Sequence, residues 1–428
     1  MNQLANLILL DAALFLMTFF SFKKKRGVSV CTFVFALYTF VGFCSINFYL
    51  APGFKGSTHD GNISTESVLY FLFVLLLFLS PLFKLKGKYQ YLLVDLRKFK
   101  YIYLSVYFCC VIVFIYTLLT NSLSIDALLS NFSDIRDDVG YYRDFSKQTL
   151  VDSIITGWVS SLMFFSITIS MFSLFVLKYK KKLSLILFIV TIAYYVLRSL
   201  LAAGRANIVF LLFSIVYNYL LMKCFFDFRQ RKYFNSILIL ISVLVCIYVL
   251  YANVARFGDS DFGESYFLWK YSGESFVNFT GILYPDIAGY TDGVSSFGFF
   301  RRILGLDYYV SMSDLRTYVE NITHTPSKIF YTFIGNIFRD FGPLLTALIA
   351  VILSVVLRKC VDNNDSNKIE FRVILLMGFL GQIYLPGLFY FSLYSQTGNI
   401  AIILMIIAFI YLKRNTKSEF VIDAYERK

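Results

Sequence analysis

Charged residues are scarce in this chain of 428 residues: aspartate, glutamate, lysine and arginine together make up 16% of it. In soluble globular domains, charged residues make up about a quarter of the chain. Hydrophobic residues here reach 58%, and the mean hydropathy is +0.67. These proportions exclude an ordinary soluble domain and predict a protein that crosses a membrane several times.

Several motifs that mark common enzyme classes are missing. The sequence has no GxxxxGK[ST] loop for nucleoside triphosphates, no HExxH zinc motif and no GxSxG nucleophile turn. Histidine occurs only twice, and the seven cysteines show no spacing typical of a metal clamp. We therefore expect no metal and no cofactor.

Apolar stretches of about 20 residues alternate with short clusters of lysine and arginine, a pattern typical of membrane-spanning helices and not of barrel strands. The expected spans are residues 3–22, 28–50, 67–83, 101–120, 153–177, 183–222 as two crossings, 233–252, 343–357, 369–389 and 398–412. The sequence thus predicts an all-α polytopic integral membrane protein with about 11 transmembrane helices.

The net charge of +13 is explained by where the basic residues lie. Most lysines and arginines fall in loops that would share one side of the membrane, which the positive-inside rule makes cytoplasmic. This distribution predicts an N-terminus outside and a C-terminus inside. It also removes the need for a nucleic-acid partner.

The expected spans divide the chain into three parts. Residues 1–252 hold transmembrane helices 1–8 with short loops, residues 253–342 form one large outer loop between spans 8 and 9, and residues 343–428 hold the last three helices and a cytoplasmic tail. Loops of this length are usually functional. Near its end, Thr325 and Pro326 predict the start of an amphipathic interfacial helix, with Arg339 on its polar edge.

Two arginines, Arg198 and Arg205, interrupt the apolar block 183–222. Because basic clusters flank the block on both sides, it holds two crossings folded at Gly204, which places Arg205 at an outer turn and Arg198 deeper. A charge at the membrane centre costs about 2.5 to 3.5 kcal/mol, so such residues usually face a cavity or a partner. A guanidinium group suits a phosphate or pyrophosphate, although Arg198 could instead extend to the outer interface.

Other candidates follow the later spans. Arg256 comes directly after the eighth span and would either converge with Arg205 on one headgroup or serve as an interfacial anchor. Arg302 and Arg339 of the large loop are either ligands or solvated charges. His324 would act as a general base, hold a phosphate, or belong to a helix-capping environment.

The chain resembles the Wzy-type polymerases of bacterial surface polysaccharides. Its architecture is similar over the whole length, with many aromatic-rich spans and one large outer loop in the second half. The residues that carry the resemblance are Ala203-Gly204-Arg205 between two spans, Arg256 after the next span, and PSKIFYTFIGNIFRDFG at 326–342.

This resemblance implies metal-independent glycosyl transfer on the periplasmic face of the bacterial cytoplasmic (inner) membrane. Undecaprenyl-pyrophosphate-linked oligosaccharide repeat units would be joined into O-antigen or capsular polysaccharide. The lipid bilayer and, in the cell, a chain-length regulator and a flippase are the partners it implies.

In that reaction, each candidate has an expected role. Arg205 and Arg256 would stabilise the charge of the leaving pyrophosphate, and His324 or a carboxylate would deprotonate the acceptor hydroxyl. Arg198, Arg302 and Arg339 would bind substrate.

Three alternatives remain open. A purely structural membrane subunit would leave Arg198 and Arg205 unexplained. A lipid-linked polysaccharide ligase would share the donor and differ in the acceptor. A polysaccharide flippase or other transporter would be expected to show an internal repeat and charges along several spans, and the sequence shows neither.

Overall fold

The computed structural model describes residues 2–51, 62–86, 89–120, 155–201, 206–257, 263–307, 309, 312–362, 367–413 and 419–423. The chain divides into two compact units. The first comprises Met1–Lys86, Asn253–Asp362 and Ile383–Ser395, and the second comprises Gly87–Ala252, Asn363–Gln382 and Gln396–Lys428.

Ten helices in the described part of the chain are long and apolar enough to cross a membrane. Nine of these apolar stretches coincide with or overlap the following helices: α1 (Gln3–Lys25), α2 (Val30–Leu50), α3 (Thr65–Lys84), α4 (Leu96–Thr120), α9 (Lys181–Leu201), α10 (Ala206–Met222), α11 (Phe228–Phe257), α16 (Thr332–Val361) and α17 (Phe371–Tyr384). The remaining one is formed by η2 (Ile155–Val159), α8 (Met163–Met171) and η3 (Phe172–Val176). Together with the shorter apolar helix α18 (Gln396–Tyr411), they confirm the all-α polytopic membrane fold.

The apolar block 183–222 forms two helices, as predicted. These are α9 and α10, which pack against each other in the second unit. The break between them falls at residues 202–205, which lie outside the described residues.

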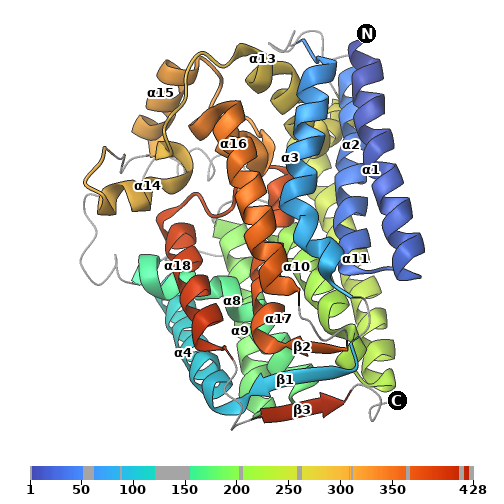
Figure 1. Cartoon of the computed structure of the whole chain (residues 1–428), viewed down its shortest axis with the longest axis vertical. Coiled ribbons are helices and arrows are strands. Elements are labelled where there is room, and N and C mark those ends of the chain that lie inside the picture. Colours follow the sequence, from blue (N-terminus) through green and yellow to red (C-terminus); the bar gives the residue numbers. More distant parts are fainter. Residues whose placement is uncertain are drawn as a thin grey trace. The chain divides into compact units, whose positions relative to one another are not determined.

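In the first unit, α1 and α2 form a hairpin and lie side by side (Figure 1). The turn uses Arg26 in the left-handed region and Gly27 at φ 137°, a conformation that favours glycine. The Ser29 hydroxyl then accepts a hydrogen bond from the Thr32 amide and caps α2. Further along the hairpin, α1 and α2 pack closely, because Gly42 of α2 has no side chain and leaves room for the Asp11 carboxyl of α1.

The region expected as a single outer loop is largely helical. It contains the end of α11, then α12 (Gly263–Asn278), η5 (Phe279–Leu283), α13 (Tyr284–Asp286), α14 (Val294–Ile303), α15 (Met312–Thr323) and the first part of α16. The direction of α12 against α2 is set by three contacts: Tyr266 with Phe48, Gly273 with Ser45, and Phe276 with Tyr38. Along these three contacts the residue numbers rise in α12 and fall in α2, so α12 lies antiparallel to the apolar helix α2.

Helix α16 has two arms that meet at Gly342. Gly342 has φ 71° and Pro343 follows it, which breaks the regular helical hydrogen-bonding pattern. Beyond this kink the second arm runs beside α3 in the same direction, since Tyr70 donates to the Pro343 carbonyl and Ser80 bonds Ser354. The charge pattern of the sequence also predicts that these two helices run in the same direction. Which of their ends faces the cytoplasm stays a prediction.

The start of α16 differs from the sequence-based prediction. The helix begins at Thr332, and Thr325 and Pro326 lie in a non-helical segment, residues 324–331, which we call the strap. The predicted cap at Thr325 is therefore wrong. Arg339 does not lie on a polar edge either, because its side chain is only 7% exposed.

The second unit contains a small sheet that the sequence did not predict. Strand β1 (Tyr91–Asp95) lies between β2 (Lys368–Glu370), which is parallel to it, and β3 (Glu419–Asp423), which is antiparallel (Figure 1). In the same unit the Tyr217 hydroxyl donates to the Met377 carbonyl at 2.9 Å, and the ring of Tyr217 lies against Gly381. These contacts hold α10 against α17.

Candidate functional site

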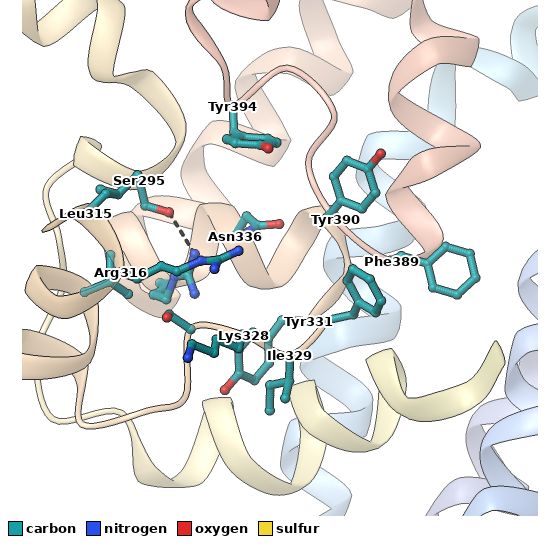
Figure 2. Close-up of a pocket in the computed structure, with 14 residues that line it drawn as sticks. Ser295, Leu315, Arg316, Lys328, Ile329, Tyr331, Asn336, Phe389, Tyr390 and Tyr394 are labelled. Atoms are coloured by element: carbon teal, nitrogen blue, oxygen red, sulfur yellow. Dashed lines mark hydrogen bonds between the residues drawn. The ribbon is translucent and has the colours of Figure 1, made fainter. Parts of the chain in front are cut away.

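A pocket of about 230 Å³ lies within the first unit (Figure 2). Its walls come from segments far apart in the sequence: Ser295 of α14, the Leu315–Arg316–Val319 face of α15, residues 327–331 of the strap, Asn336 and Arg339 of α16, and Phe389, Tyr390 and Tyr394 from the loop before α18. The pocket therefore combines the large hydrophilic region with a second, short segment between the last two helices.

Arg339 is the charged group buried in this wall. One of its terminal nitrogens donates to the Ser295 hydroxyl at 2.9 Å, and its guanidinium carbon lies 6.0 Å from the ring centroid of Tyr331. Its Nε has no hydrogen-bond partner, and no carboxylate of the described residues forms a salt bridge with it. A buried guanidinium with unused donors is costly unless an anion or other acceptor joins it.

The neighbouring Asp340 holds Ser295 in place. Its carboxylate accepts hydrogen bonds from the Thr291 hydroxyl and from the Ser295 amide. The backbone amides of Thr291 and Asp292 also bond the carbonyls of Arg339 and Asp340. The carboxylate next in sequence to Arg339 is thus engaged with the start of α14, and Ser295 is positioned to accept from the guanidinium.

The charged residues that line the pocket are Arg316, Lys328 and Arg339, and none of the described lining residues is acidic. Just outside this lining, Glu320 interacts electrostatically with all three cations. Arg316 and Lys328 are exposed, whereas Arg339 is buried. In Figure 2, Arg316 and Lys328 lie on the side opposite Phe389 and Tyr390.

Aromatic rings form the other side. The rings of Phe330 and Tyr390 stack at 6.2 Å between centroids, and Tyr390 meets Tyr394 edge-on at 6.3 Å. Burial raises the pKa of Tyr331, whose hydroxyl donates to the Pro326 carbonyl, so this phenol stays neutral at physiological pH. An aromatic wall facing cations is suited to a ligand with both an apolar face and a negative charge.

Backbone contacts at the start of α16 join the two sides. The Thr332 amide donates to the Phe389 carbonyl, and the Asn336 side-chain oxygen accepts from the Phe391 amide. Thr332 has φ 71°, an unfavourable conformation for a β-branched residue that is found mostly where function or packing requires it. This strained residue fixes the direction in which Tyr331 enters the pocket wall.

The strap is attached to α15 through Glu320. The carboxylate of Glu320 accepts from both the amide and the hydroxyl of Ser327, at 2.9 and 2.7 Å. These hydrogen bonds hold the pKa of Glu320 below its ordinary value. Because Lys328 is the next residue, the same contact positions one of the three cations.

Acidification should release the strap. A folded-state pKa below the unfolded value means that the contact stabilises the fold above the unfolded pKa, about 4.3, and that this contribution is lost as the pH falls through the folded pKa. We expect amide hydrogen exchange in residues 324–331 to rise roughly 2- to 10-fold once Glu320 is protonated, after correction for the intrinsic pH dependence of exchange. Glu320→Ala should show the same rise at neutral pH, and unchanged protection in that variant would contradict the role of Glu320.

The other predicted site residues with described side chains lie outside this pocket's lining. His324 is exposed at the end of α15 with φ 54°, and it lines a separate opening with Glu320, Asn321, Thr325 and Pro326. Arg302 is exposed on α14. Arg198 is exposed in the last turn of α9, in the second unit.

Two predicted residues are not tested by the structure. Arg205 falls in residues 202–205, outside the described residues. Arg256 lies in the last turn of α11, and its side chain is outside the described part. The expected convergence of Arg205 and Arg256 stays a prediction.

Sequence reasoning missed most of the pocket. Lys328, Tyr331 and Asn336 belong to the segment 326–342 that carries the resemblance, but nothing in the sequence distinguishes them from their neighbours there. Tyr390 and Tyr394 are four residues apart in a short loop between apolar helices, a signal too common to identify a site. The described residues contain no cluster of histidine, cysteine or carboxylate side chains that could hold a metal ion.

Comparison of the chain with protein-family models, with curated proteins and with solved structures finds no match.

Proposed function

We propose that this membrane protein is a glycosyltransferase of the Wzy type. It would polymerise undecaprenyl-pyrophosphate-linked oligosaccharide repeat units on the outer face of the bacterial cytoplasmic membrane. The products would be O-antigen or capsular polysaccharide.

The observation that carries this proposal is the pocket around Arg339. It brings a buried guanidinium with an unused donor, two further cations and a row of aromatic rings together. Ligand sites of this kind combine aromatic walls with a few placed polar groups. The arm of α16 that bears Arg339 leads through Gly342 directly into an apolar helix, so a ligand attached to a membrane lipid would have a short path to the pocket.

The reaction needs groups of this type. The acceptor hydroxyl attacks the anomeric carbon of the donor, the bond from that carbon to the pyrophosphate oxygen breaks, and the hydroxyl proton passes to a base. Negative charge develops on the leaving pyrophosphate, and fixed guanidinium groups stabilise it without a metal. Arg205 and Arg256 are the residues proposed for that step, while Arg339 is proposed to hold the saccharide.

A strain that lacks this protein should retain single repeat units and lose long chains. The measurement is the banding pattern of its lipopolysaccharide or capsule on a gel, with the intact chain restored from a plasmid as the control. Free lipid-linked polymer in the deletion strain would instead identify a ligase. An unchanged ladder would contradict both activities.

A further inference from the structure

We propose that the pocket around Arg339 binds a sugar ring that carries a carboxylate. That this sugar is part of a lipid-linked oligosaccharide rests on the proposed function, whereas its chemical class follows from the pocket itself.

The first argument is the state of Arg339. This side chain is more than nine-tenths buried, yet its Nε lacks a hydrogen-bond partner, and one terminal nitrogen donates to the hydroxyl of Ser295. Guanidinium groups carry five donors in a planar fork that matches a carboxylate. Asp340 is turned toward Thr291 and Ser295, so the described part of the wall does not supply that carboxylate.

The second argument is the charge of the rim. Arg316 of α15 and Lys328 of the strap add two exposed cations beside the buried one. Three cations in a site without an acidic lining residue among those described favour an anionic ligand over a neutral sugar. A neutral sugar would leave the Arg339 Nε without a charged acceptor, because the nearby Asp340 carboxylate bonds Thr291 and Ser295.

The third argument separates a sugar from a phosphate group. Phe330, Phe389, Tyr390 and Tyr394 give the pocket an apolar wall, with Tyr390 and Phe389 opposite the rim cations in Figure 2. A pyrophosphate has no apolar face to place against these rings, whereas the C–H face of a pyranose does. Asn336 adds an amide beside the rings, and amides commonly bond sugar hydroxyls.

The size of the pocket limits the ligand to a small unit. Its volume is about 230 Å³. Pockets for drug-sized molecules usually measure about 300 to 1,000 Å³. The space therefore suits one ring of a longer oligosaccharide, with the remaining sugars outside.

Matched soluble sugars test this inference. Methyl glucuronide and methyl galacturonide differ from methyl glucoside and methyl galactoside only at C6, where a carboxylate replaces the hydroxymethyl group. With the purified full-length protein in detergent, calorimetry should show at least one uronide binding about 10- to 100-fold more tightly than its neutral partner, as expected for charge-assisted hydrogen bonds. Inorganic pyrophosphate should bind more weakly than that uronide.

Variants assign the effect to residues. Arg339→Gln should reduce uronide affinity to that of the neutral sugar and leave the neutral sugar unaffected, whereas Tyr390→Ala should weaken both. Arg358→Gln, on an exposed surface of α16 outside the pocket lining, is the matched control and should change neither. If Arg339→Gln does not fold, Lys328→Gln at the exposed rim should give a smaller loss for the uronide alone.

Several results would overturn the inference. They are equal binding of both members of each pair, absence of binding for all four sugars, or Arg339-dependent binding of pyrophosphate that is tighter than that of either uronide. The proposed function fails separately, because it is judged by the polysaccharide ladder and these measurements involve no polymerisation. If the uronide binds but the deletion strain has an unchanged ladder, the proposed polymerase activity is wrong and the proposed binding site for an acidic sugar still holds.

Discussion

Replacing Arg339 by alanine should abolish long polysaccharide chains while the protein still reaches the membrane. The change removes the buried guanidinium and leaves Ser295 without its donor. Truncating one member of a buried charged contact commonly costs about 2 to 5 kcal/mol, which corresponds to roughly a 30- to 4,000-fold loss in kcat/KM. The measurement is the chain-length distribution on gels, normalised to the amount of protein in the membrane.

Arg302→Ala is the matched control for this prediction. From the sequence alone, Arg302 and Arg339 are both expected to bind substrate. In the structure, Arg302 is exposed on α14 and does not line the pocket. We expect it to change chain length little. A normal ladder for Arg339→Ala, or equal losses for both variants, would remove the pocket from the proposed mechanism.

The second large effect should come from Gly273→Ala. A Cβ atom at Gly273 would lie 2.4 Å from the backbone carbon of Cys44 and 2.4 Å from the backbone nitrogen of Ser45. These atoms belong to a helix and cannot rotate away, so α12 must move off α2 and the hydrogen bond from Ser45 to the Gly273 carbonyl must lengthen. Overpacking of this kind costs about 1 to 3 kcal/mol or more. A melting curve in detergent should show a clear fall in Tm.

Gly298→Ala supplies the comparison. Gly298 lies in α14 directly after the kink at Phe297, and an added Cβ there would meet no atom within 4 Å. Alanine there should be neutral or stabilise the helix by about 0.5 to 1 kcal/mol. Similar Tm values for the two variants would show that α12 does not approach α2 as closely as described.

Composition and charge spacing were sufficient to predict the helical membrane fold. Each span needs only a local run of apolar residues, so it can be recognised without knowing its neighbours. The two-helix division of 183–222 could be predicted because basic clusters flank this block on both sides and its 40 residues are enough for two crossings. The sheet of β1, β2 and β3 could not, because its strands are short and pair segments up to hundreds of residues apart.

The site was harder to predict because its geometry depends on long-range contacts. The sequence identifies Arg339 as a candidate ligand, but helical periodicity predicts a polar edge for it. Its burial results from α14, which Asp340 ties to the same helix. The cap predicted at Thr325 failed for a similar reason, since the Glu320–Ser327 contact holds this segment outside the helix. Both errors have the same cause. Local sequence patterns do not show which residues from distant segments will cover a helix face or hold a segment outside a helix.

The small sheet has a consequence for how the protein is handled in the laboratory. Strand β1 leads directly into α4, and β2 leads directly into α17. The parallel pairing of Tyr91 with Lys368 therefore fixes where the first turns of these two helices lie relative to each other. β3 covers the other edge of β1 and ends at Asp423, five residues before the last residue of the sequence. A cut at 418, which removes β3, would expose that edge to other chains. Truncated versions of the protein should therefore retain β3.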